Sequence, residues 1–227
     1  MAKNQEGKMH LPTITIDDLF STQKERDDLK LEKVVNISLS KIDDFPNHPF
    51  KVVDDDELVK MAISIKENGI LVPTIVRQKD DGRYEMISGH RRKKASALIG
   101  LEDIPCIVKD LTDDEATIIM VDSNMYREKI LPSERAFAYK MKLEAMTHQG
   151  RRNDLTSPQL GQKLTSVEKL SANSPDSKSQ IQRYIRLTEL INPLLNMVDN
   201  KEIGFSPAVE ISFLTKQEQK CNSLCQI

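Results

Sequence analysis

The stretch YEMISGHRRKKASALIGL, residues 84–101, decides how the first half of the chain folds. Its apolar start, with Tyr84, Met86 and Ile87, predicts a short strand, and Gly89 predicts a turn after it. A helix with an apolar side made by Ala95 and its neighbours is expected next. This helix opens on consecutive cations at positions 91–94, with a histidine directly before them.

Cations are unusual at a helix start, because the free backbone N–H groups and the helix dipole already make that end positive. Four basic side chains there are locally unfavourable unless an anion lies among them, and a polyphosphate is the obvious candidate. The alternative is a basic helix start that faces only solvent. From this stretch alone both interpretations stay open.

Composition narrows the class of protein. A length of 227 residues is enough for two modules. The net charge of -2 shows no overall bias toward nucleic acid, so any such contact must come from local basic patches. Aromatic residues make up 4% with no Trp, which argues against stacking platforms for single strands. We expect an intracellular protein with reduced thiols, because no apolar run approaches the ~20 residues of a membrane helix and no signal peptide is visible.

The pattern divides the chain into four parts. Residues 1–33 are polar and predict a flexible arm. Residues 34–111 predict an α/β domain with strands at 34–42, 70–78 and 104–111 and a helix at 54–69; Pro73 favours an edge or irregular position for the second strand. Residues 112–215 predict an all-α domain, with a capping box at Thr112 and Glu115, a helix over 132–150 and one helix over 205–219. Residues 216–227 are expected to be a tail.

The segment SVEKLSANSPDSKSQIQRYIRL, residues 166–187, has the spacing of a helix-turn-helix. Its second helix would bury Ile181 and Ile185. The exposed side chains early on that helix are the candidates for contacts to bases, and those late on it or after Gly150 are the candidates for phosphate. The first group is Lys178, Ser179 and Gln182, and the second is Arg183, Arg186, Arg151 and Arg152. The alternative is a helical hairpin whose polar face is only solvated.

Three stretches in order resemble the ParB family of DNA-partition proteins, which includes nucleoid-occlusion relatives. NGILVPTIVR, residues 68–77, is similar to the first family box, and ISGHRRKKASALIGL, residues 87–101, to the second, usually G-E-R-R-x-[RK]-A. SNMYREKILPSERA, residues 123–136, resembles the third, usually E-N-x-x-R-x-x-L-x-P-x-E-x-A. The resemblance covers about residues 34–214 and implies a ParB/sulfiredoxin-like α/β domain followed by an all-α helix-turn-helix DNA-binding domain.

The resemblance also implies a site for CTP and Mg²⁺ built by the three boxes. Gly69 and Pro73 would shape the loop near the base. The phosphate cradle would consist of Gly89, His90, Arg91, Arg92 and Ala95. Asn124 would hold the metal and Arg127 would reach the phosphates. The family mechanism that follows is a sliding clamp, in which a DNA-bound homodimer closes on CTP and leaves its loading site along the duplex.

The sequence departs from the family pattern at two positions of the site and at its end. His90 stands in place of the usual Glu; we expect its side chain to point outward, with little effect on binding. Ser123 stands where a Glu usually precedes Asn124, and Asp122 faces elsewhere on a helix, so we expect CTP to bind but to be hydrolysed slowly or not at all. The separate dimerisation domain common in the family is expected to be missing.

Two other functions remain open. A transcriptional regulator could use the same helix-turn-helix without spreading along DNA, and a small-molecule kinase could use the same fold superfamily. A kinase needs a catalytic carboxylate near the cradle and no DNA-reading helices. A sulfiredoxin needs a Cys at the turn, where this chain has Ser88 and Gly89. The ParB interpretation implies double-stranded DNA with a centromere-like site and a ParA-like ATPase as partners, no membrane, and a cytoplasmic, nucleoid-associated location.

Overall fold

The computed structural model describes residues 33–127, 129–153 and 166–224, without the side chains of 150–153 and 222–224. The predicted arm at 1–33 and a predicted helical piece at 156–164 lie outside these residues, apart from Lys33. Among the described helices, none has the length and apolar character needed to cross a bilayer.

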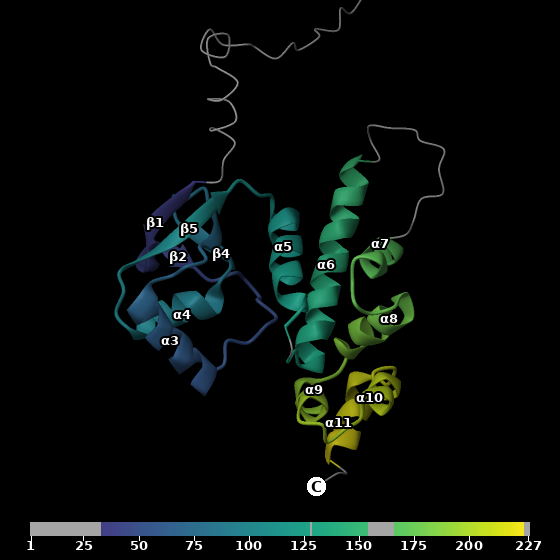
Figure 1. The fold of residues 1–227 in the computed structure, drawn as a ribbon. Helices are drawn as coiled ribbons and strands as arrows, with labels where there is room; N and C mark the ends of the chain where they lie inside the picture. Colours follow the sequence, from purple (N-terminus) through teal and green to yellow (C-terminus); the bar gives the residue numbers. More distant parts are fainter. Residues whose placement is uncertain (1–32, 128, 154–165, 225–227) are drawn as a thin grey trace, which may run out of the picture. The chain divides into compact units, whose positions relative to one another are not determined.

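A five-stranded sheet forms the first half (Figure 1), in the order β1-β5-β3-β4-β2. The strands are β1 (Val34–Ser38), β2 (Ile42–Asp43), β3 (Thr74–Gln78), β4 (Tyr84–Ser88) and β5 (Asp103–Lys109). β3 pairs antiparallel with β4 and parallel with β5, so it is the central strand. Of the two predicted alternatives, the edge position is wrong, whereas the irregular strand is confirmed by a shift in its register with β4 between Ile75 and Val76. Pro73 lies directly before the first residue of β3, so its missing N–H removes no hydrogen bond between β3 and its neighbouring strands. The expected strand at 34–42 is interrupted by a 3-10 turn, Leu39–Lys41.

Two helices accompany the sheet, α3 (Asp56–Asn68) and α4 (His90–Leu98). Asp55 caps α3 by accepting a hydrogen bond from the Leu58 N–H at 2.8 Å, and Gly69 follows the helix with φ +72°, as the sequence predicted. The two helices pack together through Leu58, Ala62, Ile65 and Ala95.

The described chain beyond β5 is helical, as predicted. Its helices are α5 (Asp113–Met125), α6 (Pro132–Asn153), α7 (Ser166–Ala172), α8 (Lys178–Leu187), α9 (Asn192–Asp199), α10 (Phe205–Ile211) and α11 (Lys216–Leu224). Thr112 and Glu115 form the expected capping box of α5. Two predictions were wrong: α6 continues past Gly150, and the single helix expected at 205–219 is two helices.

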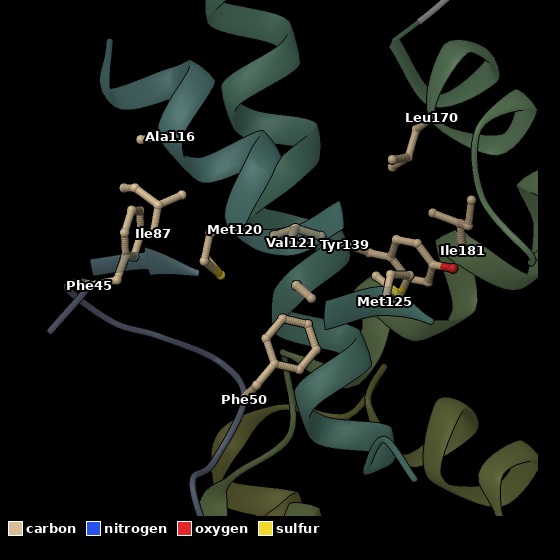
Figure 2. Packing of buried hydrophobic residues seen from close by; sticks show 11 residues of the cluster. Phe45, Phe50, Ile87, Ala116, Met120, Val121, Met125, Tyr139, Leu170 and Ile181 are labelled. Carbon is tan, nitrogen blue, oxygen red and sulfur yellow. The ribbon is translucent and has the colours of Figure 1, made fainter. Parts of the chain in front are cut away.

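One hydrophobic core connects the sheet to the helices (Figure 2). It brings Ile87 of β4 and Phe50 of the loop between β2 and α3 together with Met120 of α5, Tyr139 of α6 and Ile181 of α8, all of them nearly or fully buried. The boundary predicted at Leu111 stays a prediction, but apolar packing runs across it. A second core contains Val76 of β3, Met86 of β4 and Cys106 of β5. A third joins α6 to α8, α9 and α10.

Candidate nucleotide and DNA sites

Gly89 sets the backbone at the start of α4. It has φ +115°, which L side chains rarely adopt, and a Cβ there would lie 2.6 Å from Cγ2 of Thr74. The turn thus packs against the Thr74 side chain at a distance that a residue with a Cβ could not reach. Lys93 N–H donates to Gly89 O at 2.9 Å, and the earlier N–H groups of α4 have no partner within the helix.

A cavity of about 190 Å³ lies at this turn. It unites residues of the second and third boxes with two from the loop before α3. Its lining is His48, Val52, Met61, Ser88, Gly89, His90, Arg91, Arg92, Ser123, Asn124 and Arg127. Ligand pockets usually measure about 300–1,000 Å³, so this cavity alone fits only part of a nucleotide. Two larger hollows, of about 510 and 420 Å³, share lining residues with it and extend the space.

The cations at the start of α4 have protein partners. Arg91 donates to Asp55 Oδ1 at 2.9 Å, Lys93 lies 2.6 Å from Asp44, and Lys94 lies 2.6 Å from Asp54. The hydrogen bond from Arg91, followed by the bond from the Leu58 N–H, lowers the pKa of Asp55. Internal carboxylates therefore offset much of the positive charge that the sequence left unexplained.

Arg92 is held differently, by neutral groups. Its Nη1 donates to the carbonyls of Val72 and, at 2.8 Å, Pro73. Burial lowers the pKa of Arg92. Carbonyls orient the guanidinium without cancelling its charge, so Arg92 keeps the capacity to attract an anion.

Arg127, on the turn after α5, lines both the cavity and the 510 Å³ hollow. Within the described part of the chain its guanidinium has no hydrogen-bond or ion-pair partner. An arginine that faces a polar cavity without a partner is well placed to bind a phosphate.

His90 corrects an expectation: its side chain does not point outward. Its ring lies 3.9 Å, centroid to centroid, from that of His48, and the Nε2 atoms of both rings are buried without a hydrogen-bond partner. Burial and then the neighbouring His48 lower the pKa of His90 to about 3. Both imidazoles are neutral at pH 7, and their unsatisfied nitrogens lie at a site where a ligand could satisfy them.

The first box contributes less directly. Gly69 and Arg92 line the 420 Å³ hollow, and Pro73 takes part through its carbonyl. Ala95 is fully buried between α3 and α4, where its small side chain serves packing. Arg77, the last residue of this box, pairs with buried Glu85 at 2.6 Å and with Asp113 at 2.6 Å, so it fastens α5 to the sheet.

The proposed metal ligand, Asn124, has its amide nitrogen turned onto its own helix. That nitrogen donates to Met120 O at 2.9 Å and to Ser123 Oγ at 3.2 Å. Asp122 pairs instead with buried Lys142 of α6. A protein-held Mg²⁺ usually has one or two carboxylate ligands, and the described lining of the 190 Å³ cavity offers none. Asp55, Glu57 and Glu134 line only the neighbouring 510 Å³ hollow, and each already has a partner in the protein. The site fits the phosphates of a nucleotide, but it does not fit a Mg²⁺ ion held by the protein.

The helices α7 and α8 are joined by a turn at 173–177. Ser177 caps α8, accepting from the Gln180 N–H at 3.3 Å, while Ile181 and Leu187 face the cores. The side chains of Lys178, Ser179 and Gln182 are exposed along one face. This part of α8 is free to contact a macromolecule, although Lys178 also reaches Glu168 at 2.8 Å.

The two later arginines of α8 are attached to α10. Arg183 donates to Ser206 Oγ at 2.7 Å and lies over the ring of Phe205. Arg186 donates to Ser212 O at 2.8 Å, and its guanidinium lies 4.2 Å from the ring centre of Phe213. These partners are uncharged, so both arginines remain positive while their positions are fixed.

Asp176 anchors the turn between α7 and α8. It accepts a hydrogen bond from Tyr139 Oη at 2.6 Å and one from Arg135 Nη1 at 3.3 Å, both on α6. Burial, and then this bond to Asp176, raise the pKa of Tyr139 well above its usual value. The orientation of α8 thus depends on α6, the helix that also follows the third box.

Known proteins resemble the N-terminal domain and the helical part of the chain to different extents. Residues 23–125, which include the sheet, α4 and Asn124, match the ParB N-terminal domain family. Over these residues the chain belongs to the ParB N-terminal domain family. Relatives extend the similarity into the helical part. A nucleoid occlusion protein from Listeria innocua is 31% identical over 199 residues, which are 87% of this chain and 63% of that protein. A probable chromosome-partitioning protein ParB from Borreliella burgdorferi is 34% identical over 84% of this chain and 65% of its own length.

The chain spans less than two thirds of the length of these relatives. Among solved structures, the C-terminally truncated chromosome-partitioning protein ParB from Caulobacter crescentus complexed to the centromeric parS site has TM-score 0.50 and 19% identity over 83% of this chain and 98% of that one. The pNOB8-like ParB N-domain has TM-score 0.51 and 16% identity over 86% and 80%. At these identities the likeness concerns the fold alone.

The ParB motifs did not reveal every residue at the sites. His48, Val52 and Met61 line the cavity without a local signal, because the loop before α3, α3 itself and the glycine turn meet there only in the fold. Arg151 and Arg152 were expected on a turn, but they belong to the last turn of α6, and their side chains lie outside the described part. All the ligand contacts assigned to residues of this ParB domain and of α8 remain predictions.

Proposed function

We propose that this chain is a sequence-specific DNA-binding partition protein of the ParB type, whose N-terminal domain binds CTP and switches the protein between loading on DNA and sliding along it. The observation that carries the proposal is the meeting of distant sequence boxes at one cavity. Arg91 and Arg92 come to it from α4, and Arg127 from the turn after α5. Three arginines, free helix N–H groups and a glycine turn suit a triphosphate.

The DNA-reading part would be the helix-turn-helix of α7 and α8. Lys178, Ser179 and Gln182 are exposed at the beginning of α8, where such helices reach base edges in the major groove. Arg183 and Arg186, with neutral partners on α10, would bind backbone phosphates. A helix held by Asp176 at its turn and by α10 at its end has the rigidity that base recognition requires.

Two observations weigh against an enzyme on this fold. The cavity has no carboxylate among its described lining residues, whereas a small-molecule kinase needs one as a base. Cys106 is fully buried, and burial raises its thiol pKa, so it lacks the accessible thiolate of a sulfiredoxin-type reaction.

By analogy with the family we also propose a homodimer, a ParA-like ATPase as partner and location on the nucleoid.

The experiment starts with selection of duplexes from a random pool, followed by binding to the selected duplex with both ends blocked, with and without CTP. We expect one enriched site, accumulation on blocked DNA only with CTP, and a loss of about 1–3 kcal/mol in site affinity for Gln182→Ala. Arg127→Ala should keep the DNA site but lose the CTP response. Failure to enrich any site overturns the proposal, and site binding that CTP never alters overturns the clamp in favour of a plain regulator.

A further inference from the structure

The phosphate cavity differs from a metal-nucleotide site in its charges. Its described lining contains Arg91, Arg92 and Arg127, two imidazoles and neutral groups, without any Asp or Glu. Mg²⁺ dehydrates reluctantly and is usually held by carboxylates together with the phosphates. Three guanidinium groups around one small space also repel a divalent cation that arrives without its own anion.

The acids near the cavity already have partners. In the 510 Å³ hollow, Glu134 accepts from the Lys51 and Leu131 N–H groups at 2.8 and 3.0 Å, and Glu57 lies 3.7 Å from Arg91. Both oxygens of Asp55 accept hydrogen bonds from Arg91, and Oδ1 also accepts from the Leu58 N–H. Asp44 lies 2.6 Å from Lys93. A metal at the cavity would have to break these pairs and expose the cations that they offset.

The neutral oxygens are few. Ser123 Oγ donates to Met120 O at 2.9 Å and accepts from the Asn124 amide. That leaves Asn124 Oδ1 as the side-chain oxygen of this pair without a hydrogen bond in the described part of the chain, and a single neutral oxygen is a weak ligand for a hard cation. The turn of the third box therefore offers Mg²⁺ no ligand that would replace the water molecules bound to the ion.

Hydrogen-bond donors, by contrast, are abundant. Arg127 has no partner in the described part of the chain, and the Nε2 atom of His90 is buried and unsatisfied. A neutral imidazole can carry its hydrogen on either nitrogen, so His90 can become a donor at Nε2 without taking up charge. Together with Arg91 and Arg92 these groups can neutralise phosphate oxygens directly.

We propose that this site binds its nucleoside triphosphate without a divalent cation held by the protein, because arginines and His90 take over the neutralisation that a metal would supply. The proposal rests on the proposed function and concerns the same site. It makes Ser123 a determinant of metal dependence, since a carboxylate at that position would stand beside the free oxygen of Asn124.

The test is calorimetric titration of CTP into the full chain, in Mg²⁺ and in EDTA. We expect the wild-type affinity to change by less than about threefold between the two conditions. Ser123→Glu should make binding dependent on the metal, with an affinity at least about tenfold lower in EDTA than in Mg²⁺. Ser123→Gln, of similar size but uncharged, should keep the wild-type ratio of the two affinities.

The outcomes separate this inference from the proposed function. CTP binding by the wild type in Mg²⁺ only would overturn the metal-free site and leave the ParB-type function in place. Equal metal dependence of Ser123→Glu and Ser123→Gln would overturn the role of charge at this position. If CTP binds in neither condition, both the nucleotide function and this inference are wrong. Folding of each variant is checked by its thermal unfolding, so that a lost signal is not mistaken for lost affinity.

Discussion

The start of α4 and the outer part of α8 both collect cations, but the two regions pair them with different groups. At α4, Arg91, Lys93 and Lys94 meet carboxylates of the loops before and after Phe50. At α8, Arg183 and Arg186 meet a hydroxyl, a carbonyl and aromatic rings of α10 and of the two residues that follow it. Carboxylates cancel charge, whereas neutral partners fix a cation and leave its field intact.

This difference has a consequence for each ligand. A phosphate that enters the cavity must compete with acids already in place, so its binding depends on the cations that have no acidic partner. A DNA backbone that approaches α8 meets positive side chains whose positions are set in advance. Two clusters of basic residues that look alike in the sequence therefore form unequal electrostatic surfaces in the structure.

The largest expected effect is at the glycine turn that the α4 region requires. Gly89→Ala places a Cβ 2.6 Å from Thr74 Cγ2 at φ +115°, and we expect a loss of about 3 kcal/mol in the free energy of unfolding. Denaturant unfolding measures it. Gly100→Ala is the matched control, because its φ is +76° but its Cβ has open space, and should cost about 1–2 kcal/mol. Equal losses would show that the contact with Thr74 is unimportant.

The second prediction tests the hydrogen bonds by which Asp176 holds the turn before α8 against α6. Asp176→Ala leaves Tyr139 Oη and Arg135 without their acceptor, and we expect a loss of about 2–3 kcal/mol in stability together with weaker DNA binding. Asp176→Asn keeps an acceptor of the same shape and should lose less. CTP affinity is the internal control, since it should be unchanged in both variants. A fall in CTP affinity with intact DNA binding would reverse the assignment of the two regions.

The pH dependence of stability should come largely from the α4 region. The pKa of His90 is about 3 in the folded chain, far below the usual value near 6.5, so the unfolded chain binds the proton more readily in acid. Stability is therefore complete above about pH 6.5 and should fall by about 2 kcal/mol between pH 7 and pH 5. Urea unfolding at several pH values measures this, and His90→Gln should flatten the curve. An equally steep curve for His90→Gln would assign the dependence to other groups.

The smallest expected effect is on CTP affinity, when Asp55, the acid that competes with phosphate for Arg91, loses its charge. Asp55→Asn keeps a good N-cap for α3 but removes the charge that Arg91 now meets. CTP should bind up to about fivefold more tightly, as expected for relief of one partly exposed ion pair. At α8 the corresponding change, Ser206→Ala beside Arg183, removes no charge and should leave the salt dependence of DNA binding as it is. Weaker CTP binding by Asp55→Asn would mean that the acid orients Arg91 rather than competing for it.

Local signals predicted a good part of this structure. The caps of α3, the capping box of α5 and the strand–turn–helix around Gly89 depend on neighbouring residues, which the sequence displays directly. The split between α10 and α11 was missed although a signal existed: Thr215 and Glu218 form reciprocal hydrogen bonds that start α11. Pro73 misled because a proline just outside a strand looks the same in sequence as one inside it.

The remaining features depend on contacts between distant segments. Nothing near His90 predicts that His48, from the loop before α3, will lie against it. Likewise, the polar face of α8 does not reveal that α10 will hold its last arginines. The sequence motifs supplied the candidate residues, but the partners that decide their charge and freedom come from tertiary structure.

The most direct test of the role of unpaired cations compares Arg127, which lines the cavity, with Lys93, a cation of α4 that is paired with a carboxylate outside the cavity lining. CTP affinity is measured by calorimetry for wild type, Arg127→Ala and Lys93→Ala, with ATP, GTP and UTP as controls for the base. Arg127 has no partner in the described chain, so its loss should cost about 10- to 100-fold in CTP affinity. Lys93 is paired with Asp44 at 2.6 Å, and its loss should cost less than about fivefold. Equal losses, or a larger one for Lys93→Ala, would contradict the claim that unpaired cations make the site.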